Sequence, residues 1–172
     1  RKRLRAPISL KSLSDDGRFA GYASVFGVVD SQADVVERGA FADTIRGRVS
    51  AVKLLWQHQQ DEPIGVISEL FEDARGLYVE GRLLPEVARA KEVLALMKAG
   101  ALSGLSIGYR IVTSRIDTKR KARILTEVDL FEISLVTFPA NDAARISEVK
   151  AGGKALVARK GKTGTRKTAG AK

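Results

Sequence analysis

Alternation of apolar and polar residues runs through most of this chain and predicts a protein built mainly from β-strands. Four stretches rich in β-branched and aromatic residues have the pattern typical of strands. They are residues 18–29, 51–56, 105–116 and 123–138. Two further strands are predicted within residues 63–84, joined by a turn at Glu72–Gly76, and Pro139 ends the last long strand.

Helical periodicity is clearest over residues 85–100. Pro85 suits the first turn of a helix and Gly100 suits the residue after its end. The apolar residues at helical spacing, which we expect to face the core, are Val87, Ala90, Leu94 and Met97.

Two shorter helices are predicted, one near Phe41–Ile45 within a polar loop and one over residues 141–149, capped by Asn141. Many strands with few helices indicate a mainly β fold of the α+β type. We expect a β-barrel or curled sheet with flanking helices.

A chain of 172 residues suits one domain. We expect that domain over residues 1–150 and a disordered basic tail over residues 151–172, where Gly, Ala, Lys and Thr dominate. No apolar run is long enough to span a bilayer, so we expect no membrane partner. The absence of cysteine excludes disulfides, thiolate zinc sites and a cysteine nucleophile, and no cofactor is predicted.

The net charge of +10 is concentrated at the two ends of the chain. Residues 1–5 carry four basic side chains and residues 151–172 carry seven, with no acid, whereas residues 6–150 carry 19 basic and 20 acidic side chains. Basic ends are compatible with non-specific nucleic-acid contact, with an acidic protein surface, with a segment that is later removed, or with simple solvation.

The candidate chemistry begins with His58, the sole histidine, at the end of the predicted strand 51–56. A lone histidine is more often structural, but any nucleophile–histidine mechanism here must use this one. Ser106 lies between Gly104 and Gly108, whose missing side chains leave room on its face of a strand for a substrate backbone. Ser103 has the opposite parity and lies nearer the helix end, so the spacing favours Ser106.

A histidine base also needs a group that orients it. Glu132 lies inside an apolar strand, where a carboxylate is costly to bury unless it is paired, and is therefore a candidate partner for His58. An outward-facing Glu132 is an equal alternative on this pattern, and Asp129 is the reserve.

Four motifs, taken in order, resemble the prohead (capsid-maturation) proteases of tailed double-stranded-DNA bacteriophages. They are GYASVFGVVDSQADVVERGAF (21–41), LLWQHQQDEPIGVI (54–67), LMKAGALSGLSIGYR (96–110) and VDLFEISLVTFPAND (128–142). The resemblance covers roughly residues 5–148 and implies a β-barrel similar to that of the herpesvirus assembly proteases.

The resemblance implies that Ser106 is the nucleophile, His58 the base and Glu132 the third member, where the herpesvirus enzymes have a second histidine. It places the oxyanion donors, by analogy, in the loop at residues 137–142. The implied substrates are the capsid scaffold, or the scaffolding domain of the major capsid protein, and the protease itself. Cleavage would take place inside the immature procapsid in the host cytoplasm, for a phage or a prophage.

A homo-oligomer, such as a dimer, is also implied by the resemblance. Two alternatives stay open at this point. One is an inactive capsid or scaffold component that keeps the protease fold, and the other is a nucleic-acid-binding domain that uses the basic tails.

Overall fold

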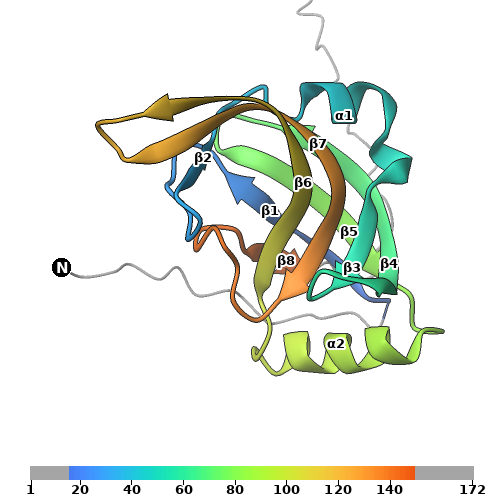
Figure 1. Ribbon diagram of the computed structural model, residues 1–172. Helices are drawn as coiled ribbons and strands as arrows, with labels where there is room; N and C mark the ends of the chain where they lie inside the picture. Colours follow the sequence, from blue (N-terminus) through green and yellow to red (C-terminus); the bar gives the residue numbers. More distant parts are fainter. Residues whose placement is uncertain (1–15, 150–172) are drawn as a thin grey trace, which may run out of the picture.

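One curled sheet of eight strands, with two helices against its outside, makes up the part of the chain that the computed structural model describes, residues 16–149 (Figure 1). The strands are β1 (Arg18–Val25), β2 (Asp34–Val36), β3 (Lys53–Trp56), β4 (Gln59–Glu72), β5 (Gly76–Leu83), β6 (Gly104–Asp117), β7 (Ala122–Val136) and β8 (Ile146–Val149). The helices are α1 (Ala42–Gly47) and α2 (Ala88–Lys98), and a 3₁₀ turn spans Val49–Ala51.

Strand β7 is the central strand of the site described below. It pairs with β6 in antiparallel fashion along one edge, and with β2 and then β3 in parallel fashion along the other. The remaining strands continue in the order β4, β5, β1 and β8. A bridge between Gly104 and Arg145 brings the start of β6 next to the β8 end of the sheet, so the sheet curls into an incomplete barrel.

The interior of this curl is the hydrophobic core. Its largest fully buried side chains come from most strands and from the segment before α1, and they include Phe19, Phe41, Leu54, Leu77, Leu105 and Ile133. Helix α2 covers one end of the barrel through Ala90, Val93 and Met97. Burial alternates along most of β5, as the strand period of two predicts, whereas residues 132–136 of β7 are buried on both faces.

The fold confirms the expected class and most of the predicted elements. The helix predicted at 85–100 is present over Ala88–Lys98, followed by Gly100 with a φ of 71°. Its buried positions include Val93, which was not among the predicted core-facing residues, whereas Leu94, which was, is only partly buried.

The helix predicted at 141–149 was wrong. The Asn141 side chain accepts the Ala143 N–H at 3.1 Å and closes a short turn, and the chain continues as strand β8, antiparallel to β1. The edge of β1 offers backbone partners there, and these outweigh a weak local helix preference. The predicted polar loop also hides a strand, β2, which pairs with β7.

The basic tail predicted over residues 151–172 lies outside the described residues. Within residues 16–149, neither helix has the length and apolar character needed to cross a bilayer.

Candidate active site

The register of three neighbouring strands brings the predicted site residues together. Across the β6–β7 ladder, Ser106 is opposite Ser134 and Gly108 is opposite Glu132. On the other edge of β7, β3 runs alongside the same residues and ends at Trp56, two residues before His58. Strand β7 thus lies between the strand that carries Ser106 and the strand that delivers His58.

A tight turn holds His58 at this position. Gln57 and His58 form the two-residue connection between β3 and β4, with φ values of 50° and 61°. Positive φ at both positions is the pattern of a type I′ hairpin turn, and it costs roughly 1 kcal/mol or more for each non-glycine residue. Contacts to β7 and its end hold the turn: the Gln57 N–H donates to the Leu135 carbonyl at 3.1 Å, and the Gln57 amide donates to Thr137 Oγ1 at 2.7 Å.

The His58 imidazole bridges Glu132 and Ser106. Its Nδ1 lies 2.6 Å from Glu132 Oε1, and its Nε2 lies 3.0 Å from Ser106 Oγ. An ionised carboxylate only accepts hydrogen bonds, so it favours the tautomer with the proton on Nδ1. Nε2 is then free to accept the Ser106 proton, and the predicted order of serine, histidine and acid is present in space.

The three side chains differ in their exposure, and burial affects the pKa of His58. Ser106 is buried and the Glu132 side chain is 11% exposed, whereas the His58 side chain is 44% exposed. The hydrogen bond to Glu132 raises the pKa of His58 above its ordinary 6.5, and its partial burial opposes this with a smaller effect. The imidazolium is therefore favoured by its acidic neighbour, which is the property that a proton-accepting base needs.

The glycines beside Ser106 have a different role from the predicted one. A Cβ at Gly108 would overlap the Glu132 carboxylate, and a Cβ at Gly104 would lie 2.5 Å from the Val136 carbonyl oxygen. The space that these glycines leave is filled by the protein itself and not held open for a substrate backbone. Gly108 makes room for the acid that contacts His58.

The two reserve residues lie elsewhere. Ser103 is in the segment between α2 and β6, where its hydroxyl lies 3.5 Å from the Arg145 guanidinium. The Asp129 carboxylate pairs with Arg48 and Arg110 instead of His58.

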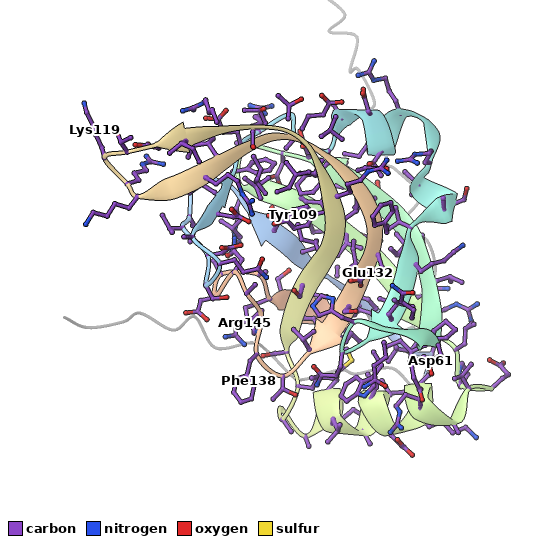
Figure 2. The ribbon with its side chains drawn as sticks, viewed as in Figure 1. Asp61, Tyr109, Lys119, Glu132, Phe138 and Arg145 are labelled. Atoms are coloured by element: carbon purple, nitrogen blue, oxygen red, sulfur yellow. The ribbon has the colours of Figure 1, made fainter. Side chains whose placement is uncertain are left out.

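A cleft of about 570 Å³ opens beside Ser106 and His58, between β1 and β6. This volume is within the usual range for a ligand site. Its lining includes Ala23, Ser24, Val28, Asp30, Val36, Ile107, Tyr109, Ile111 and Asn141. Phe138, 90% exposed, is at its rim, and Figure 2 shows Phe138 at the outer edge while Tyr109 and Glu132 lie within the curve of β6 and β7.

A second polar cluster, which the sequence pattern did not reveal, lies along the same cleft. The Arg123 guanidinium donates two hydrogen bonds of 2.8 Å to Asp34, which is 1% exposed, and the Tyr109 hydroxyl donates to Asp34 at 3.2 Å. Burial and the nearby Asp34 charge raise the pKa of Tyr109, so its hydroxyl keeps its proton. Residues 16–149 contain no group of three or more histidine or carboxylate side chains arranged to hold a metal ion.

Ser134 was also missed, although a signal for it was present. It shares the parity of Glu132 on β7, and it is fully buried next to both Glu132 and the His58 backbone. Parity indicates which residues share a face, but it cannot show that a histidine from another strand reaches that face.

This geometry defines a class of protein. A buried serine, a histidine and a carboxylate, in hydrogen-bonding order beside a cleft on a curled β-sheet, form the arrangement that acyl-transfer enzymes use to activate a hydroxyl. The chain belongs to the Caudovirus prohead serine protease family, which matches residues 6–158.

Individual phage proteins are also similar in sequence to this chain. The prohead protease of Enterobacteria phage HK97 is 37% identical over 136 residues, covering 78% of this chain and 60% of the relative. The capsid polyprotein of Pseudomonas phage PAJU2 is 34% identical over 157 residues, covering 86% of this chain and 22% of the polyprotein. The chain thus spans less than two thirds of the length of these two relatives.

Solved structures support the fold. The capsid assembly protease of bacteriophage T4 has a TM-score of 0.53 at 17% identity, covering 69% of this chain and 82% of that one. The KSHV protease, in complex with a hexapeptide phosphonate inhibitor, has a TM-score of 0.52 at 13% identity, covering 75% and 63%. The expected likeness to the herpesvirus protease fold is confirmed.

Proposed function

We propose that this chain is a serine endopeptidase in which Ser106 is the nucleophile, His58 the general base and Glu132 the group that orients His58. One observation carries the proposal: an unbroken line of hydrogen bonds of 2.6 and 3.0 Å joins Glu132, His58 and Ser106. The line ends at a cleft large enough for several substrate side chains.

The reaction follows from this order of groups. Ser106 Oγ bonds to the carbonyl carbon of the scissile peptide while its proton passes to His58 Nε2. The C–N bond then breaks, and the imidazolium gives that proton to the leaving amine. Water hydrolyses the acyl-enzyme by the same route, and Glu132 stabilises the imidazolium in both halves. The backbone N–H groups of the loop at residues 137–142 stay the predicted oxyanion donors.

The open edge of β6 suits an extended peptide substrate. Within residues 16–149, β6 pairs with β7, and its other edge has a bridge only at Gly104. Residues 107–109 and Ile111, just past Ser106, line the cleft. An extended segment could add to this edge through backbone hydrogen bonds and place a carbonyl near Ser106.

The substrates that we propose are the capsid scaffold, or the scaffolding domain of the major capsid protein, and the chain itself. The place of action is then the immature procapsid in the host cytoplasm. Membership of the prohead protease family supports this, as does the related segment in a capsid polyprotein. Self-association and nucleic-acid contact through the basic ends stay predictions.

A fluorophosphonate probe tests the chemistry. We expect labelling that maps to Ser106, that is lost in His58→Ala, and that persists in Ser103→Ala, the matched control. Labelling that maps to Ser103 would overturn the assignment of the nucleophile. A folded chain that stays unlabelled up to high protein concentration would favour an inactive protease-fold component.

Mass spectrometry tests the substrates. The chain is incubated alone and with the major capsid protein of the same phage, with Ser106→Ala as the control. We expect new termini in both incubations, and none with Ser106→Ala. Cleavage that Ser106→Ala leaves unchanged would point to a contaminating protease.

A further inference from the structure

Ser134 lies at the centre of the site, and its hydrogen bonds go to His58 and Glu132. It is on β7, opposite Ser106 on one side and opposite Leu55 of β3 on the other. It is 0% exposed, so solvent cannot satisfy its hydroxyl.

The Ser134 hydroxyl makes two hydrogen bonds within the site. It donates to Glu132 Oε2 at 2.7 Å, and it accepts the backbone N–H of His58 at 3.0 Å. The two oxygens of Glu132 thus have different partners: Oε1 contacts the His58 ring, and Oε2 is held by Ser134. A carboxylate fixed at both oxygens is restrained from rotating away from the imidazole.

The backbone bond restrains the histidine itself. His58 has a φ of 61°, in the left-handed region where a residue with a side chain is strained. In a two-residue hairpin the second loop residue has no partner in the ladder for its N–H, so this donor needs one from elsewhere. Ser134 supplies it, and one hydroxyl thereby ties the base and the acid to the same point of β7.

We propose that Ser134 is a positioning residue that sets the distance and angle between the His58 ring and the Glu132 carboxylate. This rests on the proposed function of Ser106, His58 and Glu132. Ser134 takes no proton in the reaction; it acts through the two groups that it holds. An error of about 1 Å in such geometry can reduce a rate by about 10²-fold.

The test compares Ser134→Ala with Thr44→Val. Thr44 is a matched control: its hydroxyl is also buried, at 1% exposure, and it also accepts a backbone N–H, that of Leu130 on β7, at 3.2 Å. It has no bond to His58, Glu132 or Ser106 among those described. Both variants lose a buried hydroxyl, but only Ser134→Ala removes hydrogen bonds to His58 and Glu132.

Two readouts separate positioning from simple stability. The first is the second-order rate of fluorophosphonate labelling at Ser106. The second is the downfield ¹H resonance of the His58 Nδ1 proton, which is unambiguous in an untagged chain because His58 is the sole histidine. For Ser134→Ala we expect labelling to slow by roughly 10- to 100-fold and the resonance to shift or broaden. For Thr44→Val we expect both to match the wild type, whatever the change in Tm.

Labelling and a resonance in Ser134→Ala equal to those of the wild type would overturn the inference and leave the proposed function standing. A wild type that shows the resonance but takes no label would instead overturn the proposed function. If Ser134→Ala does not fold, Ser134→Cys keeps a side chain of similar size with only a weak donor. Slower labelling at Ser106 in that variant supports the inference, and labelling at the wild-type rate overturns it.

Discussion

Glu132 on β7 and Asp34 on the neighbouring strand β2 are two of the three buried carboxylates within residues 16–149, and they differ in the partner that each has. Glu132 faces the imidazole of His58, whereas Asp34 faces the guanidinium of Arg123, which lies opposite it in the parallel β2–β7 pair. Histidine exchanges its proton near neutral pH, but arginine stays charged. The first pair is therefore suited to proton transfer, and the second fixes the short strand β2 against β7 at the wall of the cleft.

Both carboxylates would be costly to bury alone, and their surroundings repay that cost differently. Asp34 has two bonds from Arg123 and one from the Tyr109 hydroxyl, so all its local donors come from groups that keep their protons. Glu132 accepts one hydrogen bond from the neutral Ser134 hydroxyl and one from the His58 ring, which titrates. The partner of each carboxylate, and not the carboxylate itself, therefore decides whether the pair is suited to stabilise the fold or to transfer a proton.

The largest effect is expected for Glu132→Gln. The amide can donate to the histidine ring, which favours the wrong tautomer, and it cannot stabilise the imidazolium. We expect kcat/KM to fall on the order of 10³- to 10⁴-fold with a small change in Tm. Cleavage of a peptide substrate and thermal unfolding measure the two quantities. An activity near that of the wild type would show that Glu132 does not orient His58.

The next largest effect is expected for Gly108→Ala. The new methyl group would overlap the Glu132 carboxylate and displace it from His58. We expect about a 10²-fold loss of labelling at Ser106 and a destabilisation of about 1–3 kcal/mol. Gly47→Ala is the control, because a Cβ there meets nothing within 4 Å. Equal behaviour of the two variants would contradict the close approach of Glu132 to β6.

A loss of stability is expected for Arg123→Ala. It leaves the Asp34 charge buried with only the Tyr109 hydroxyl, so we expect Tm to fall by several degrees. The control is Arg115→Ala, which breaks an exposed pair with Glu37 and should leave Tm nearly unchanged. Differential scanning fluorimetry compares them. Equal losses of Tm in the two variants would show that the buried Asp34–Arg123 pair stabilises the fold no more than an exposed pair does.

The smallest effect is expected in the pH dependence. In the proposed mechanism His58 must be neutral, so we expect kcat/KM to rise with pH through the His58 pKa, which the Glu132 hydrogen bond raises above 6.5. Replacing Glu132 by Gln should move the midpoint to lower pH, whereas Arg123→Ala should leave it in place. The same raised pKa stabilises the fold below pH 6.5, and this contribution is lost as the pH rises through the folded pKa. A titration of the single imidazole by NMR checks both statements, and an unmoved midpoint in Glu132→Gln would contradict them.

Much of the fold could be predicted from local pattern. Alternation located β6 and β7, and helix signals located α2, because each is long enough for its periodicity to outweigh local noise. The short elements could not be predicted in this way. The three-residue β2 and the four-residue β8 are strands because they pair with the backbones of β7 and β1. These partners are far away in the chain, so local pattern cannot predict the pairing.

The sequence by itself determined the chemistry available to this protein: one histidine, a glycine-flanked serine and an acid in an apolar strand. It also indicated which residues share a face within β6 and within β7, since the strand period is two, but it left open whether Glu132 points inward. Only the tertiary structure decided that the His58 ring reaches across β7 to Ser106 and that Ser134 holds Glu132. It also decided that the Glu132 carboxylate occupies the space where a side chain at Gly108 would lie. The physical reason is register: strand pairing sets which residues meet, and it is fixed by contacts across the whole sheet.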